Sequence, residues 1–393
     1  MPHFFAHSHF AATDMPMTAF LMLFVMSASR GMEAGKPWLG GLLLGILASI
    51  KATSVLLALP LLALFLISHR KEFVKGLRTA LLLGLTAVLT FYLLNPDWWY
   101  SPLSRASEFI AQTVTRKDWA PLSVLFGGTV YSYRAPFTYP FVMFFITTPL
   151  LHILFLLVGL GRFFRDKTLR ADQRMIAGLV CFLTPFVLLA LPLSPTIDGI
   201  RYLLPAFPFA ACWMTTGLVA LWKFITRSQA KPLAVTLLRL GLAVVSLALF
   251  ALDLHNPARR PPYELSYYNS LVGGLAGAHR RGYETTYWWE ILNESALREV
   301  NALTSGSRVY FPVLPTDLFF VHARNKGMLT FAVAEDVRDV EFILIFGRPN
   351  VSYWEEGIQS SLKKEGKTIA PVWEISIDSV PLLRLHRVGQ ASS

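Results

Sequence analysis

Charged side chains are rare in the apolar first half of this chain, and a few could do chemistry. They are Asp14, Lys51, Arg134 and Arg201, with Tyr202 beside the last. A charge inside or at the edge of a bilayer costs roughly 2.5 to 3.5 kcal/mol, so each is a functional hypothesis by default. When the apolar segments are threaded through a membrane in order, these residues fall on one face. Their convergence predicts a site there.

Composition indicates the class of protein that must position these residues. The chain has 393 residues, of which 54% are hydrophobic and only 16% are charged, too apolar for an ordinary soluble globule. The net charge of +11 gathers in short loops between apolar runs, where basic residues mark the cytoplasmic side. This distribution favours a polytopic membrane protein and argues against a nucleic-acid partner.

The apolar segments predict eight membrane crossings. One long segment, residues 38–68, is expected to form a tight hairpin that turns near Lys51, because both flanking basic loops then lie on the cytoplasmic side. The other segments are residues 15–29, 77–94, 137–160, 175–193, 202–222 and 233–252.

Each arm of the hairpin has about 15 residues, or roughly 22 Å of helix, which is short for a hydrocarbon core near 30 Å. The turn is therefore expected below the outer surface, with Lys51 in a protein-lined cavity where an anion is its natural partner. The alternative is that Lys51 reaches the outer headgroups and has no further role.

The composition changes after Asp253, where proline, charge and short β-like runs appear. The sequence predicts an α-helical membrane bundle over residues 1–252 and a small α/β domain outside the membrane over residues 253–393. Residues 104–117 could form an amphipathic helix lying on the membrane.

Motifs of soluble enzymes are scarce, since the sequence contains no P-loop, no HExxH and no serine nucleophile elbow. No cofactor is indicated with certainty. His7 and His9 lie within one or two helical turns of Asp14 and are weak candidates for a divalent metal site.

Several segments, in this order, resemble landmarks of the GT-C membrane glycosyltransferases related to protein O-mannosyltransferases and lipid A aminoarabinose transferases. They are AHSHFAATDMPMTAF, GLLLGILASIKATSVLLALP, RAPFTYPFVMFFITTPL, IDGIRYLLPAFPF and PPYELSYYNSLVGGLAGAHRRGYETTYWWE. Each segment is a weak signal, whereas the ordered set is fairly specific.

The resemblance implies transfer of a sugar from a polyprenyl-phosphate-sugar donor to a lipid, glycan or protein acceptor on the outer face of a bacterial cell membrane. Lys51 and Arg201 would then stabilise the leaving phosphate, with Tyr202 and Arg134 as further donor-binding candidates. For Arg201 and Tyr202, anchoring at the membrane interface is the alternative role.

The acceptor must lose a proton, and Asp14 is the acidic residue of the opening segment. It also precedes Met15 and Pro16 at an apparent helix start, which is typical of an N-cap. The sequence leaves both roles open, and one carboxylate can serve both.

The chain departs from the family at its beginning, because the relatives carry an acidic outer loop after a first helix and no matching motif occurs here. An N-terminally incomplete chain, and hence an inactive one, is therefore a hypothesis. Two other functions stay open, namely a non-catalytic scaffold of cell-envelope synthesis and a transporter of an anionic lipid.

Overall fold

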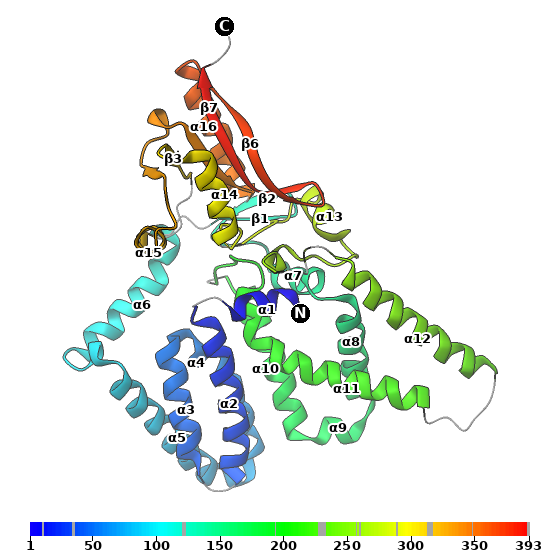
Figure 1. The fold of residues 1–393 in the computed structure, drawn as a ribbon. Helices are drawn as coiled ribbons and strands as arrows, with labels where there is room; N and C mark the ends of the chain where they lie inside the picture. Colours follow the sequence, from blue (N-terminus) through cyan, green and yellow to red (C-terminus); the bar gives the residue numbers. More distant parts are fainter. Residues whose placement is uncertain are drawn as a thin grey trace. The chain divides into compact units, whose positions relative to one another are not determined.

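The computed structural model describes residues 1–390 except 10–11, 34–35, 120–122, 193, 227–232, 257, 259–260, 288–289, 313–316 and 348. The chain is mostly helical, with a small sheet region near its C-terminus (Figure 1). It divides into two compact units. The first contains residues 3–122 and 136–251, and the second contains residues 123–135 and 252–393.

The first unit consists of helices. They are α1 (Pro2–Ser8), α2 (Asp14–Glu33), α3 (Pro37–Ile50), η1 (Ala52–Ser54), α4 (Val55–Ser68), η2 (Arg70–Glu72), α5 (Phe73–Leu94), η3 (Pro96–Trp98), α6 (Pro102–Trp119), α7 (Tyr139–Thr147), α8 (Leu150–Arg165), α9 (Lys167–Ala171), α10 (Gln173–Ala190), η4 (Arg201–Ala206), α11 (Phe207–Thr226) and α12 (Leu233–Leu254). Helices α2 and α5 each contact α3, and α8 contacts α11. The chain passes into the second unit near the end of α12.

Among the described residues, four helices are long and apolar enough to cross a membrane, or five if the bent pair α7 and α8 forms one span. Three shorter apolar helices lie at Asp14–Ser27, Pro37–Ile50 and Ala52–Ser68. The predicted eight crossings are not confirmed, because they require each of these shorter helices to cross as well. What is confirmed of the predicted membrane bundle is a mostly helical chain with four or five candidate membrane spans.

The predicted break in the long apolar run is confirmed at Lys51. Helix α3 ends at Ile50, Lys51 has an extended backbone with φ −157° and ψ 107°, and α4 begins at Val55. Each helix has 14 residues. Ser54 closes the turn, because its hydroxyl donates to the carbonyl of Leu47 at 3.0 Å. The break therefore leaves Lys51 at the junction of two helices instead of within one.

Glycines allow two helix pairs of the first unit to approach closely. A Cβ added at Gly217 of α11 would lie 1.9 Å from the carbonyl oxygen of Phe155 in α8, and one at Gly159 of α8 would lie 2.0 Å from that of Trp213. A Cβ at Gly41 of α3 would similarly lie 2.4 Å from the carbonyl oxygen of Leu83 in α5. Small residues at contacts are how membrane helices gain packing without a hydrophobic driving force.

The second unit combines two sheets with short helices. Its elements are β1 (Ser123–Phe126), β2 (Thr129–Ser132), η6 (Glu264–Ser266), α13 (Gly274–Arg280), α14 (Glu294–Thr304), β3 (Arg308–Tyr310), α15 (Asp317–Asn325), β4 (Ala332–Ala334), η7 (Val337–Asp339), β5 (Phe342–Phe346), α16 (Pro349–Lys364), β6 (Lys367–Ile377) and β7 (Val380–Gln390). Strands β1 and β2 form an antiparallel hairpin. The larger sheet has the order β4-β3-β5-β7-β6.

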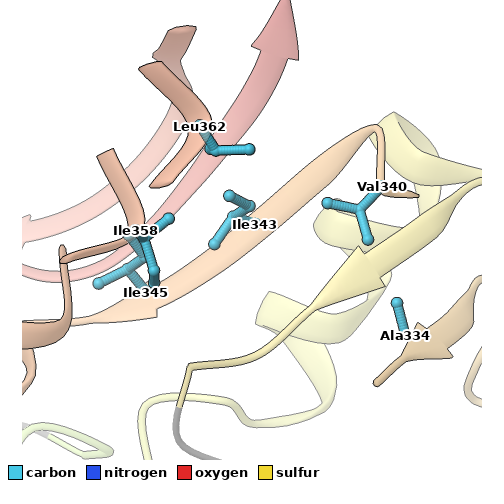
Figure 2. Close-up of a cluster of buried hydrophobic side chains, with 6 residues drawn as sticks. All are labelled: Ala334, Val340, Ile343, Ile345, Ile358 and Leu362. Atoms are coloured by element: carbon cyan, nitrogen blue, oxygen red, sulfur yellow. The ribbon is translucent and has the colours of Figure 1, made fainter. Parts of the chain in front are cut away.

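The core of the larger sheet is apolar. Strand β5 is buried along its whole length, which explains its unbroken hydrophobic sequence FILIF. Figure 2 shows Ile343 and Ile345 of β5 beside Ile358 and Leu362 of α16, with Ala334 and Val340 in the same cluster. Strands β3 and β4 run parallel, as do β3 and β5, whereas β7 runs antiparallel to β5 and β6.

The short β-like runs predicted after Asp253 correspond to strands of the larger sheet, and the predicted helix at 104–117 corresponds to α6. The hairpin of β1 and β2 was not predicted. Its residues belong to the second unit although they lie far from it in the sequence. The division into a membrane domain over residues 1–252 and an extracytoplasmic domain over residues 253–393 stays a prediction.

We expect Gly217→Leu to lower the free energy of unfolding by about 1 to 3 kcal/mol, because the added side chain collides with the backbone of α8. Thermal unfolding in detergent, followed by intrinsic fluorescence, measures the effect. Gly161→Leu on α8 is the matched control, since a Cβ there meets nothing within 4 Å. Equal losses in the two variants would contradict the close contact between α8 and α11.

Candidate functional site

Asp14 is the first residue of α2 and is buried, with 2% of its surface exposed. Its backbone carbonyl accepts a hydrogen bond from the Thr18 hydroxyl at 2.8 Å, within the first turn of the helix. The contacts that the structure describes for its carboxylate are with side chains of distant segments, not with backbone N–H groups of α2. This favours a tertiary role for Asp14 over the N-cap that the sequence also allowed.

Two cations share this carboxylate. The Nζ of Lys51 lies 2.6 Å from Asp14 Oδ1, and the Nε of Arg201 lies 2.6 Å from Asp14 Oδ2. Lys51 comes from the junction between α3 and η1, and Arg201 opens η4, 187 residues after Asp14. Three of the predicted site residues are therefore in direct contact.

Tyr202 and Asp198 complete the group. The Nζ of Lys51 lies 4.8 Å from the centre of the Tyr202 ring, a cation–π distance, and the Cζ of Arg201 lies 5.6 Å from it. Asp198 Oδ2 accepts a hydrogen bond from Arg201 Nη1 at 3.2 Å. We call Asp14, Lys51, Asp198, Arg201 and Tyr202 the Asp14 cluster.

Asp198 was not predicted as a site residue. Its signal in the sequence is an acidic residue three positions before an arginine. The turn depends on left-handed backbone at Asp198, with φ 56°, and at Gly199, with φ 63°. Asp and Gly tolerate this conformation better than most residues. The turn carries the Asp198 carboxylate to the guanidinium of Arg201.

The Asp14 cluster is close to charge neutrality, since two carboxylates face two cations. Lys51 and Arg201 are 22% and 19% exposed, so the cations are partly accessible while Asp14 is not. Burial of these charges is costly, and their mutual attraction offsets the cost only with good geometry. The carboxylate thus holds two cations side by side that would otherwise repel each other.

His7 is buried and interacts electrostatically with both Arg201 and Asp14. Burial, His3 and Arg201 lower the pKa of His7 to about 3, and Asp14 only partly opposes them. His7 is therefore neutral at physiological pH and adds no third cation. His9 is exposed, and its Nδ1 lies 2.8 Å from the carbonyl oxygen of Phe5.

The metal hypothesis gains no support. In the described part of the chain, no group of three or more His, Cys, Asp or Glu side chains could hold a metal ion. His7 and His9 accordingly stay weak candidates.

Arg134 belongs to the second unit, unlike the Asp14 cluster. Its backbone N–H donates to the carbonyl of Ser132 at 2.7 Å, next to Tyr133, which has a positive φ of 63°. A role for Arg134 in donor binding stays a prediction.

The chain thus combines apolar helices with a cluster of charges around a buried carboxylate, and part of it matches a known family. Residues 16–192 match the model of glycosyltransferase family 87, a membrane family of the GT-C type. The predicted resemblance to GT-C glycosyltransferases is confirmed. The match indicates a glycosyltransferase, and with the apolar helices it indicates an integral membrane protein.

The family 87 segment contains Lys51, begins just after Asp14 and ends before Arg201. The match alone therefore does not cover the whole Asp14 cluster, and the roles of its residues rest on their geometry. Searches of curated proteins and of solved structures gave no match.

We expect Asp14→Asn to destabilise the protein by about 3 to 5 kcal/mol, because it leaves two neighbouring cations without their shared carboxylate. Thermal unfolding in detergent measures the loss. Combining it with Lys51→Met, which removes one cation, should recover part of the stability.

The matched control is Glu72→Gln, which breaks an exposed pair with Lys75 whose partners are 61% and 77% exposed. This change should leave the thermal unfolding of the protein nearly unchanged, because an exposed ion pair contributes little to stability. A neutral effect of Asp14→Asn would show that the carboxylate does not hold the two cations.

Proposed function

We propose that the protein transfers a sugar from a polyprenyl-phosphate-sugar donor to an acceptor on the outer face of the membrane. The Asp14 cluster would bind the donor phosphate. The observation that carries the proposal is the meeting of Lys51 and Arg201 at one buried carboxylate, in a chain that matches a glycosyltransferase family. The lipid, glycan or protein nature of the acceptor is left open.

The chemistry of the transfer explains why two cations are useful. The bond between the anomeric carbon and the phosphate oxygen breaks, and its electron pair stays on the phosphate. A bond forms between the anomeric carbon and an acceptor hydroxyl oxygen, whose proton passes to a phosphate oxygen or to water. Negative charge grows on the leaving phosphate, and preorganised cations in a site of low dielectric stabilise it.

Lys51 and Arg201 would share this work in different ways. The ammonium of Lys51 is a compact charge with three N–H donors. One of these donors makes the 2.6 Å hydrogen bond to Asp14. The guanidinium of Arg201 has a planar fork that suits two phosphate oxygens. Its Nε already donates to Asp14 and its Nη1 to Asp198, so the carboxylates fix the direction in which the fork points.

The geometry favours a positioning role for Asp14 over the general base that the sequence suggested. Both of its carboxylate oxygens bind cations at 2.6 Å, and neighbouring cations favour the ionised form of a carboxylate over the protonated one. A base must take up the acceptor's proton, whereas Asp14 is better arranged to keep Lys51 and Arg201 together before the donor arrives. Preorganisation of this kind costs no rearrangement during the reaction.

The remaining parts of the proposal concern topology. The Asp14 cluster and the second unit would lie on the outer side of a bacterial cell membrane, because the basic loops of the first unit mark the opposite side. The second unit would then be available to an acceptor outside the membrane.

We expect Lys51→Ala and Arg201→Ala each to lower the transfer rate more than tenfold, since each removes stabilisation on the order of 2 to 4 kcal/mol from the transition state. Arg201→Lys should recover little, because an ammonium lacks the planar fork. Transfer of radiolabel from a set of polyprenyl-phosphate sugars in membranes measures the rates.

Arg239→Ala is the matched control, because Arg239 lies over the Phe224 ring, 5.8 Å from its centre, and has no contact with the Asp14 cluster among the described interactions. Its rate should stay near that of the wild type. Near-native rates in both Lys51→Ala and Arg201→Ala, with expression verified, would end the phosphate-site proposal.

Tyr202 offers a separate test, because the centre of its ring lies 4.8 Å from the Nζ of Lys51. We expect Tyr202→Phe to keep most of the transfer activity and Tyr202→Ala to lose about threefold or more, in line with about 0.5 to 2 kcal/mol for a cation–π contact. The same radiolabel assay measures both variants. Equal losses in the two would instead assign the effect to the hydroxyl.

A further inference from the structure

A second candidate site lies inside the first unit. It is a cavity of about 630 Å³ lined by residues of α2, α3, α4, α5, α10 and α11. Its walls are mostly apolar and include Phe24, Leu59, Leu83 and Phe209. Volumes of about 300 to 1,000 Å³ are usual for ligand sites, so the cavity has room for an apolar chain.

One end of this cavity is polar. Ser68 and His69 line it at the end of α4, and Gln173 and Arg174 line it at the start of α10. Arg174 is exposed at the surface, and its backbone N–H donates to Asp172 at 2.8 Å, which fixes the first turn of α10. His69 Nδ1 lies 3.0 Å from the carbonyl oxygen of Phe65, which orients the ring.

This polar end is far from the Asp14 cluster. Helix α4 begins shortly after Lys51 and ends just before His69, and its 14 residues span about 21 Å. None of the Asp14 cluster residues is among the described residues that line the cavity. A phosphate bound by Lys51 and Arg201 therefore cannot also be bound by Arg174.

Further basic residues surround the polar end. The chain after His69 carries four cations, Arg70, Lys71, Lys75 and Arg78, which line a shallow hollow of their own. Glu72 is the acidic residue among them and pairs with Lys75 at 2.9 Å. The polar end thus has a net positive charge beside an apolar cavity.

We propose that this cavity binds an anionic phospholipid of the membrane. One acyl chain would lie between α4, α10 and α11, and the headgroup phosphate would lie at Arg174 and His69. The four cations that follow His69 in the chain would add to the positive charge near the headgroup. Apolar walls match the acyl chain, and clustered cations next to a membrane attract anionic headgroups. The inference does not depend on sugar transfer, because it concerns a site at the other end of α4.

The test is binding of phosphatidylglycerol to the purified full chain, with phosphatidylcholine as the neutral reference. A phosphatidylglycerol with a photoreactive group in one acyl chain identifies the contacted residues by mass spectrometry. We expect crosslinks in α4, α10 and α11, and weaker crosslinking of the phosphatidylcholine analogue.

A substitution that fills the cavity distinguishes lipid bound inside it from lipid bound elsewhere on the protein surface. A Cβ added at Gly178, which lines the cavity, meets nothing within 4 Å, so Gly178→Leu should fold and occupy the acyl-chain space. Gly161→Leu is the matched control, since Gly161 has equally open surroundings and is not among the lining residues. Phosphatidylglycerol crosslinking should fall in the first variant and persist in the second.

Removing charge tests the headgroup site. We expect Arg174→Ala to weaken phosphatidylglycerol binding about fivefold, as the loss of one cation near an anionic surface implies. Arg165→Ala, at the end of α8 and outside the cavity lining, should leave binding unchanged.

Three outcomes would overturn the proposal. They are equal binding of the two phospholipids, equal losses in Arg174→Ala and Arg165→Ala, and displacement of the crosslink by polyprenyl phosphate but not by phosphatidylglycerol. The last result would assign the cavity to the donor lipid. None of these three outcomes depends on whether the wild-type protein transfers sugar. The proposed function is therefore tested separately, by the radiolabel assay.

Discussion

The buried carboxylate of Asp14 is the constraint on which the arrangement of the first unit depends. It meets Lys51 and Arg201 at 2.6 Å each, and these residues come from three segments that are distant in sequence. An unpaired charge at this depth is costly, so the start of α2, the break after α3 and the start of η4 must stay together. The ionic contacts thereby hold together the ends of three apolar helical segments.

The backbone around this constraint is shaped to allow it. An unbroken helix over residues 38–68 would carry Lys51 within its apolar length, whereas the extended backbone at Lys51 places it at a junction. The left-handed turn at Asp198 and Gly199 brings a second carboxylate to Arg201. Glycine contacts between α3 and α5 and between α8 and α11 let the helices around these points pack closely.

The first unit therefore has two polar centres at opposite ends of α4, with an apolar cavity reaching one of them. The Asp14 cluster is balanced in charge and combines a buried carboxylate with two partly accessible cations, as suits chemistry on a phosphate. At the other end His69 is half-buried and Arg174 is exposed, and basic residues follow, as suits lipid headgroups. The two centres are separated by the length of α4, so each can be tested by its own substitutions.

The sequence by itself indicated the membrane class, the break at Lys51 and the strands of the larger sheet. It also predicted one group of Asp14, Lys51, Arg134, Arg201 and Tyr202, of which Arg134 belongs to the second unit. Hydrophobic runs, loop charges and rare polar residues are local signals, and each is readable along the chain. Only the tertiary structure decided that Asp14 holds both cations, that Asp198 joins them and that β1 and β2 belong to the second unit. These facts depend on contacts between distant segments, and spacing along the chain does not determine which oxygen of a carboxylate meets which cation.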